Sequence, residues 1–461
     1  MSTSSAPNSV VYRKRRGAEA VLVALALLIV IAAFCAVGLG ARDRIPGFVF
    51  GLSVCLVVIA VATHLVVRFV APYADPVLVP LVVTLNGLGV AMIYRIDLAE
   101  LDRSGADANQ FAGRQVLWTA LGLALFVAVL LIVRDHRKLQ RFTYTFGLIA
   151  FVLLILPLLP VIGTEIHGAR IWVRIGPFSL QPGEFAKICL AIFFAGYLVV
   201  KRDALALAGR RFMGIDFPRG RDLGPILVAW LVSLGVLVFQ RDLGSSLLFF
   251  GLFVVMLYIA TERPGWLVVG TTLFLGGATF AAMTFGHVQV RIDAWLHPFP
   301  VTDGTYQLVQ GLYGMAWGGL LGRGLGQGSP EITPFGYSDF IFASIGEELG
   351  LAGAMAVILM YALIVERGLR TALLCRDAFG KLLAAGLAVS IALQVFVVVG
   401  GVTRVIPLTG LTTPFLSYGG SSILANWAII ALLLRISDQS RRPPPESAPL
   451  QMDDATQVVK L

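Results

Sequence analysis

Long runs of apolar residues constrain this chain more than any other feature of its sequence. The run VLVALALLIVIAAFCAVGL, from Val21 to Leu39, contains no charged residue, and about 20 such residues cross the apolar core of a bilayer. Comparable runs recur along the chain, and only 14% of its 461 residues are charged. Average soluble domains carry about 25% charged residues. The composition therefore excludes a water-soluble globule and a chain that is disordered in water.

In lipid, only helix bundles and closed barrels satisfy the hydrogen bonds of the backbone. Barrel strands would alternate in polarity over about ten residues, whereas these runs are continuous. We therefore predict an all-α polytopic membrane protein, a bundle of about 12 transmembrane helices with a long outer loop. The predicted spans are 18–39, 47–67, 76–94, 114–133, 142–161, 185–200, 223–240, 243–260, 264–286, 340–365, 382–403 and 413–434.

The predicted organisation has four parts. Residues 1–17 form a cytoplasmic N-terminal segment, 18–70 two additional N-terminal helices, 71–438 the main transmembrane core, and 439–461 a disordered cytoplasmic tail. The first span is longer than the apolar region of a signal peptide, which has about 7–15 residues. We therefore interpret it as a retained anchor.

The distribution of Lys and Arg predicts the orientation. An even number of spans places both termini on one side, and cytoplasmic loops carry an excess of Lys and Arg. With the N-terminus inside, 24 of the 36 basic residues fall in inside segments, 11 fall outside, and Lys187 lies within a span. The net charge of +9 thus indicates topology and attraction to anionic lipid headgroups rather than nucleic-acid binding.

The four cysteines are predicted to be structural thiols. Cys35, Cys55, Cys189 and Cys375 lie within or beside spans, with no CxxC pair and no His at the spacing of metal ligands. The pattern excludes a disulfide scaffold and predicts no metal site. It identifies no cofactor with certainty and leaves room for a divalent cation.

The chemically dense sequence falls in four outer segments, 161–184, 239–246, 287–339 and 403–422. Arginine suits bidentate recognition of phosphate, so the basic residues of these segments could form one pocket. Their alternative role is contact with headgroups or solvent. The candidates are Arg170, which lies beside Trp172, and Arg174, Lys187, Arg241, Arg291 and Arg404.

Carboxylates near membrane depth are functional candidates because ionised groups are costly there. Asp242 lies between two apolar spans, and Asp339 directly precedes the tenth. Glu184 and Lys187 are three residues apart and share one helical face. The alternatives are structural: an ion pair that fixes a helix end for Glu184 and Lys187, and a helix N-terminal carboxylate for Asp339.

Two adjacent glutamates, Glu347 and Glu348, lie about two turns into the tenth span. Carboxylates at that depth need partners. One is expected to face the cavity above it, and the other to pair with an outer arginine.

Five motifs, taken in order, resemble the SEDS family of shape, elongation, division and sporulation proteins, which includes RodA and FtsW. The resemblance covers about residues 80–438. The motifs are GARIWVRIGPFSLQPGEFAK (168–187), FQRDLGSS (239–246), YQLVQGLYGMAWGGLLGRGLGQG (306–328), YSDFIFASIGEELGLAG (337–353) and TGLTTPFLSYGGSS (409–422).

The resemblance implies an inverting peptidoglycan glycosyltransferase in the bacterial cytoplasmic membrane, with its active face outward. Its substrate would be lipid II, a disaccharide-pentapeptide on undecaprenyl pyrophosphate, and its partner a class B penicillin-binding protein. The family's essential acidic residue maps onto Asp339. Substrate-binding residues carried over by resemblance are Arg170, Glu184, Lys187, Asp242, Ser417, Ser421 and Ser422, and we add Trp172, Arg291, Gln307 and Arg404 from the same outer segments.

Thr409 favours an elongation role. Division members tend to have Lys in the corresponding stretch, whereas this chain has PLTGLT, so it is closer to RodA than to FtsW. The other hypotheses are a lipid flippase or transporter and a scaffold that only activates its transpeptidase. Transporters place their sites near the membrane midplane, whereas most polar motifs here are predicted on one face.

Overall fold

The computed structural model describes residues 14–443, apart from 106–109, 161, 167, 177, 207, 213–214 and 221–222. Most of the predicted N-terminal segment and of the predicted C-terminal tail therefore lies outside the described residues.

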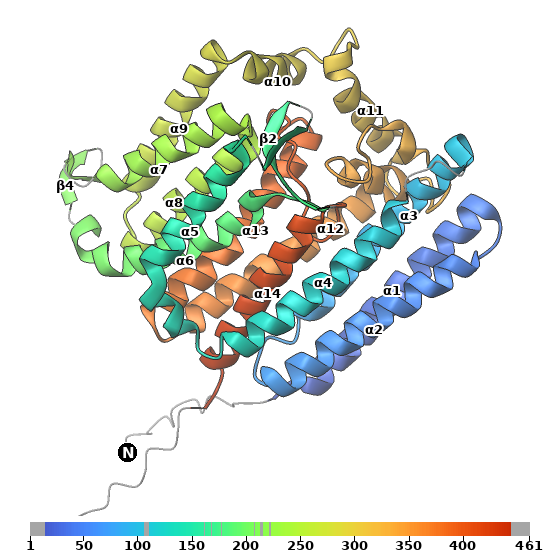
Figure 1. The fold of residues 1–461 in the computed structure, drawn as a ribbon, viewed down its shortest axis with the longest axis horizontal. Coiled ribbons are helices and arrows are strands. Elements are labelled where there is room, and N and C mark those ends of the chain that lie inside the picture. Colours follow the sequence, from blue (N-terminus) through green and yellow to red (C-terminus); the bar gives the residue numbers. More distant parts are fainter. Residues whose placement is uncertain are drawn as a thin grey trace, which may run out of the picture.

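The chain folds as a bundle of helices (Figure 1). Among the described residues, eleven helical segments are long and apolar enough to cross a membrane. These segments are α1 (Arg16–Arg42), α2 (Gly47–Val70), α3 (Leu78–Ser104), α4 (Phe111–Ile132), η2–α5–η3 (His136–Phe142, Thr143–Ile155, Leu156–Leu158), α6 (Pro182–Ala206), α8 (Leu243–Thr261), α9 (Gly265–Thr284), α12 (Ile341–Leu374), α13 (Ala378–Val402) and α14 (Gly420–Ser440).

The predicted seventh span is α7 (Gly224–Gly235), continued by the π-helix η5 (Val236–Gln240). Each of the twelve predicted spans thus corresponds to helix, and the predicted bundle is confirmed. The main differences are at the boundaries. The sixth span, predicted to be short, is a helix of 25 residues, and it places Glu184 and Lys187 in its first two turns.

The last predicted span begins too early. Residues 413–419 lie outside α14, which starts at Gly420. Their apolar character comes from burial inside the protein, because Phe415 and Leu416 are fully buried. Hydropathy alone does not distinguish a buried loop from the end of a transmembrane helix.

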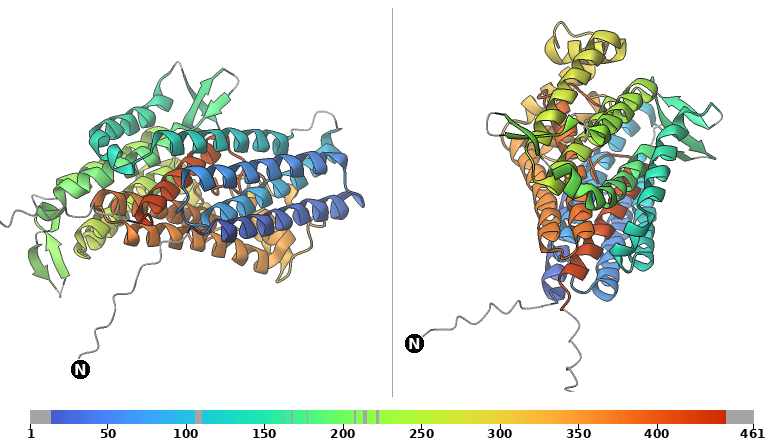
Figure 2. Two further views of the ribbon diagram at one scale, coloured as in Figure 1. Left: turned by 90° about the horizontal axis from the view of Figure 1, so that it is seen from below. Right: turned by 90° about the vertical axis from the view of Figure 1, so that its left-hand side faces the viewer.

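The all-α prediction did not include strands, but the outer segment 161–184 contains them. It forms a three-stranded antiparallel sheet of β1 (Gly163–Ile166), β2 (Ala169–Ile175) and β3 (Phe178–Leu180). Gly168 and Gly176, with φ of +79° and +60°, adopt the left-handed backbone that glycine tolerates. The sheet projects beside the helices (Figure 2). A second hairpin joins β4 (Ala208–Phe212) to β5 (Ile215–Pro218).

The long outer segment also contains secondary structure. It includes α10 (Gly286–Leu296), α11 (Asp303–Gly318) and the short 3-10 helix η6 (Pro330–Ile332). Figure 1 shows α10 and α11 at the same end of the bundle as the sheet that contains β2. The predicted outer segments therefore meet at one end of the molecule.

The glycine-rich segment 318–328 packs against α12 through two buried glutamates. Glu348 pairs with Arg95 at 2.9 Å and accepts a hydrogen bond from the Gly326 backbone. Glu347 accepts one from the Ser329 backbone at 2.6 Å. The expected pairing of one glutamate with an outer arginine is confirmed for Glu348.

The centre of the bundle is formed by α3, α13 and α14, whose membrane-spanning parts are mostly buried, whereas α1 and α2 lie at the periphery. At the end opposite α10, Tyr73 donates a backbone hydrogen bond to Asp438 at 2.8 Å, and Lys14 lies over the Tyr73 ring. The first and last described segments are thus neighbours, as an even number of spans requires.

Candidate active site

Asp339 lies in a tight turn directly before α12. The segment 403–419, which connects α13 to α14, holds that turn in place. Ser417 donates its hydroxyl to the Ser338 carbonyl at 2.7 Å, and the Tyr418 amide donates to the Tyr337 carbonyl at 2.8 Å. Two parts of the chain about 80 residues apart therefore fix the backbone on which Asp339 is carried.

Arg291 reaches the same segment from α10. Its Nη1 donates to the carbonyls of Leu408 and Thr409, at 3.1 and 2.8 Å. Gly410 follows with φ of +77°, and a Cβ there would lie 3.6 Å from Asp339 Oδ2 and 3.9 Å from Arg291 Nη2. The carboxylate and the guanidinium therefore approach the same backbone position, where the positive φ favours glycine.

Asp242 adds a second carboxylate to this region. It is the N-cap of α8, where its Oδ1 accepts from the Ser245 amide at 3.0 Å and its Oδ2 from the Ser245 hydroxyl at 2.5 Å. Its charge acts on both Asp339 and Arg291. We call Asp242, Arg291 and Asp339 the Asp339 cluster.

Electrostatics distinguish Asp339 from an ordinary surface carboxylate. Burial raises its pKa to about 7; the charge of Asp242 adds to this effect, while the Ser338 hydrogen bond and the Arg291 charge oppose it. Burial also raises the pKa of Asp242. Two carboxylates near one cation cannot both ionise easily, so the cluster is suited to holding and exchanging one proton near neutral pH.

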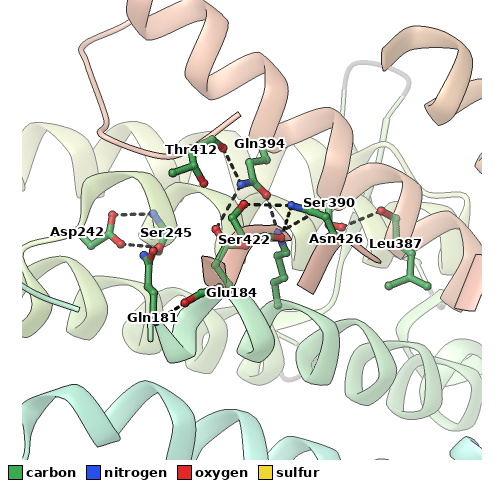
Figure 3. Close-up of polar contacts among 12 residues, drawn as sticks. Gln181, Glu184, Asp242, Ser245, Leu387, Ser390, Gln394, Thr412, Ser422 and Asn426 are labelled. Carbon is green, nitrogen blue, oxygen red and sulfur yellow. Dashed lines mark hydrogen bonds and ion pairs between the residues drawn. The ribbon is translucent and has the colours of Figure 1, made fainter. Parts of the chain in front are cut away.

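Glu184 and Lys187 belong to a different, fully buried group of side chains. Lys187 Nζ donates to Glu184 Oε2 at 2.5 Å, Gln394 Oε1 at 2.7 Å and Asn426 Oδ1 at 3.3 Å. Figure 3 shows Glu184, Gln394 and Asn426 converging from α6, α13 and α14. We call these four residues, with Ser422, the buried network.

The two serines of α14 join this end of the bundle together. Ser422 accepts a hydrogen bond from Asn426 at 3.1 Å, within the buried network. Ser421 accepts from the Gln181 amide at 2.8 Å, which ties the start of α6 to the start of α14. Both serines are buried, so their observed hydrogen bonds hold the ends of the helices in position.

Four other predicted residues lie apart from these two groups. Arg170 is exposed on β2 and pairs with Glu165 at 2.9 Å, and Trp172 lies on the same strand. Gln307, on α11, donates to the Pro334 carbonyl at 3.4 Å. Arg404 donates to the Trp295 and Leu296 carbonyls, at 2.7 and 3.3 Å, and so caps the C-terminal end of α10. The basic residues that were expected to form one pocket therefore lie in separate places.

Sequence reasoning missed the two amides of the buried network and the role of Gly410. Gln394 and Asn426 are amide residues within mostly apolar stretches of α13 and α14, and a buried amide in such a stretch was the available signal. Gln394 also donates to the Thr412 carbonyl at 2.9 Å, two residues from Gly410. The buried network and the Asp339 cluster therefore meet at the same short segment.

An apolar groove of about 760 Å³ lies elsewhere, between α12 and α13. Leu369, Leu373 and Phe396 are among its lining residues, and their exposed apolar side chains suit contact with lipid or another apolar helix. No predicted site residue lines this groove.

The fold and the cluster define a polytopic membrane protein with a base and a cation at one end. The model of the FtsW, RodA and SpoVE proteins, described as cell cycle protein, matches residues 76–442. Peptidoglycan glycosyltransferase RodA of Mycobacterium tuberculosis is 48% identical over 431 residues, which cover 93% of this chain and 92% of that protein. A probable peptidoglycan glycosyltransferase FtsW of Geobacter metallireducens is 33% identical over 80% of this chain and 96% of its own length.

A solved structure concerned with the coordination of polymerization and crosslinking by a peptidoglycan synthase complex shares the fold. It has a TM-score of 0.60 and 25% identity, and the match covers 80% of this chain and 98% of the other. The chain belongs to the FtsW/RodA/SpoVE family, the SEDS proteins. Within that family it is a RodA-like membrane glycosyltransferase, and the FtsW alternative is less well supported.

Proposed function

We propose that this chain polymerises lipid II into peptidoglycan strands at the outer face of the bacterial cytoplasmic membrane, for cell elongation. The observation that carries this proposal is that Asp339 and Arg291 approach Gly410 together, with the charge of Asp242 acting on both. Glycosyl transfer from a lipid pyrophosphate needs a base for the attacking hydroxyl and a cation for the leaving group. The Asp339 cluster contains both.

Asp339 would act as the general base. The acceptor 4-hydroxyl of GlcNAc attacks the anomeric carbon of the donor MurNAc, and Asp339 takes the hydroxyl proton as the new glycosidic bond forms. The bond between that carbon and the pyrophosphate oxygen breaks, and undecaprenyl pyrophosphate leaves with the electron pair. One displacement inverts the anomeric centre.

Arg291 is our candidate for stabilising the pyrophosphate as it leaves. It is the cation whose charge acts on both carboxylates of the cluster, and its Nη1 is anchored to two carbonyls. An anchored guanidinium is already oriented before substrate arrives, which lowers the cost of reorganisation during the reaction. Asp242 would tune Asp339 through its negative charge.

The orientation rests on the distribution of basic residues. The sheet, α10 and α11 lie at one end of the bundle, and Arg291 of α10 belongs to the Asp339 cluster. This end corresponds to the basic-poor segments of the sequence. The first and last described segments lie at the other end. The positive-inside rule then places both termini in the cytoplasm and Asp339 outside.

We further propose a class B penicillin-binding protein as partner, because the similar solved chain belongs to a complex that coordinates polymerization with crosslinking. The transpeptidase would join the strands that this chain produces.

The test uses the purified full chain in detergent with fluorescent lipid II, alone and with its transpeptidase. The proposal predicts glycan polymer that is insensitive to moenomycin. In the same preparation, labelled lipid II in vesicles reports translocation. Translocation without polymer in both arms would support a flippase and contradict the proposal. No polymer in either arm, together with faster crosslinking of pre-formed strands by the transpeptidase when this chain is present, would support the scaffold alternative and contradict the proposal.

A further inference from the structure

A second group of reactive side chains lies at the end of the bundle opposite Asp339. Asp339 precedes α12, and this group lies where α12 ends, 34 helical residues later. His136 of η2 approaches Asp377 with 2.8 Å between Nε2 and Oδ2, and Cys375 Sγ lies 3.3 Å from the same oxygen. One donor atom from each of the three residues lies within 4.8 Å of the others.

The three donors pack against Gly380, which has no side chain. A Cβ there would lie 2.6 Å from Cys375 Sγ and 2.9 Å from Asp377 Oδ2, and closer still to His136 Nε2. The absence of a side chain at this position therefore lets the three donor atoms lie next to one another. A zinc ion would bond to them at about 2.3 Å from sulfur and about 2.0–2.2 Å from nitrogen and oxygen.

The hydrogen bonds of His136 orient its ring for such a role. Gln439 Nε2 donates to the Arg134 carbonyl at 2.7 Å, so Gln439 Oε1 faces His136 Nδ1 and accepts its proton in a short contact. In the metal-free state Nε2–H donates to Asp377 Oδ2 at 2.8 Å; a metal ion would replace this proton and keep the Nδ1–H donation to Gln439. Histidines that bind metals commonly donate their second ring N–H in this way.

The two oxygens of Asp377 have different partners. Its Oδ1 accepts from the Gly380 amide at 2.7 Å and caps α13, while its Oδ2 faces His136 and Cys375. The Arg137 Nε atom lies 3.7 Å from Oδ2, but that side chain is 62% exposed and can turn away.

We propose that His136, Cys375 and Asp377 bind a zinc ion. A nitrogen, a thiolate and a carboxylate are ligands that Zn²⁺ prefers, and water completes the tetrahedron. Binding releases the Cys375 thiol proton and the His136 Nε2 proton, because the thiolate sulfur and the unprotonated nitrogen are the ligands. The ion joins the α4–α5 connection to the α12–α13 connection, and Gln439 links both to α14. Sequence spacing gives no sign of the site, because His136 and Asp377 are 241 positions apart.

The test measures metal binding by the purified, tag-free full chain in detergent. After incubation with zinc and desalting, we expect about one zinc per chain. Cobalt in place of zinc should give a thiolate-to-cobalt charge-transfer band and the visible bands of a tetrahedral ion. Zinc far below one per chain together with no thiolate band in the wild type would overturn the proposal, and this result does not depend on any variant folding.

Matched variants locate the ion. Cys375→Ser should remove the thiolate band, whereas Cys189→Ser, in α6, should keep it. Gly380→Ala adds a methyl group that crowds all three donor atoms and should abolish binding, whereas Gly51→Ala, which meets nothing within 4 Å, should not. Gln439→Ala should weaken zinc affinity about 10–100-fold. Retention of the thiolate band in Cys375→Ser would contradict the assignment, as would normal zinc binding by Gly380→Ala.

Discussion

The buried network and the Asp339 cluster meet at the same segment of chain but differ in how their charges are matched. In the buried network, the one cation, Lys187, donates all three of its protons to Glu184, Gln394 and Asn426, and it is 1% exposed. In the Asp339 cluster, one arginine acts on two carboxylates, and Asp339 is only partly buried.

This difference in how the charges are matched indicates that the buried network positions helices, whereas the Asp339 cluster takes part in chemistry. A saturated, desolvated ion pair has no donor or acceptor left for a substrate, so its contribution is to hold α6, α13 and α14 in register. A cluster with an excess of carboxylate has a group whose proton is loosely held. We therefore assign Lys187 to positioning and Asp339 to chemistry, although the sequence presented both as site candidates.

The largest expected effect on stability comes from breaking the buried network. Lys187→Met leaves Glu184 buried without its cation, which costs about 3–5 kcal/mol. Thermal unfolding in detergent should show a strong loss of stability. Lys138→Met, at an exposed position in η2, is the control and should unfold like the wild type.

Adding Glu184→Gln to Lys187→Met should restore part of the lost stability, because no charge then remains buried. If Lys187→Met unfolds normally and only loses activity, Lys187 acts in the reaction as Asp339 does, and its assignment to positioning is wrong.

Arg291→Gln tests the chemical role assigned to the Asp339 cluster. It removes the cation next to Asp339, and loss of one preorganised electrostatic group costs about 10²–10³-fold in rate. Initial rates of lipid II polymerisation measure it. Arg44→Gln, at an exposed residue that lies outside the cluster, should polymerise normally. A wild-type rate for folded Arg291→Gln would remove Arg291 from the mechanism.

The pH dependence of polymerisation follows from the raised pKa of Asp339, which is about 7. A general base works only when ionised, so the rate should fall as pH drops through this value. Asp242→Asn removes a negative charge that raises the pKa of Asp339, and should move the fall to lower pH. Arg291→Gln should move it to higher pH. Profiles that coincide for all three proteins would show that another group controls the rate.

The smallest expected effect is that of Ser417→Ala. The Ser417 hydroxyl accepts from the Thr413 amide at 2.8 Å and donates to the Ser338 carbonyl at 2.7 Å. Loss of one such hydroxyl costs about 1 kcal/mol, so the unfolding temperature should fall slightly and the rate should fall with the pH profile unmoved. A shifted profile would indicate direct contact between Ser417 and Asp339 or its substrate.

The bundle was predictable because membrane spans depend on a local property, the length of an apolar run. The sheet of residues 163–180 was less predictable, because its strands are only three to seven residues long and the prediction was of an all-α protein. The boundary before α14 failed for a related reason: residues 413–419 are apolar because protein, not lipid, surrounds them. Hydropathy measures how apolar a segment is and does not distinguish burial by protein from burial by lipid.

The site was predictable only in part. Asp339 and Asp242 lie in recognisable motifs, but Arg404 and Arg170, equally prominent in the sequence, bind α10 carbonyls and Glu165 instead. Whether an arginine reaches a carboxylate depends on helix packing that no local pattern encodes. The proposed metal ligands show the same limit, because His136 and Asp377 become neighbours only through the fold.

The most direct test of the central claim is Asp339→Asn, assayed for both folding and polymerisation with fluorescent lipid II. Asparagine keeps the shape of the side chain but cannot accept the proton, and general base catalysis contributes about 10²–10⁴-fold. We expect an unfolding temperature close to that of the wild type and a polymerisation rate at least about 10²-fold lower. Folded Asp339→Asn that makes normal polymer at the wild-type rate would contradict the account.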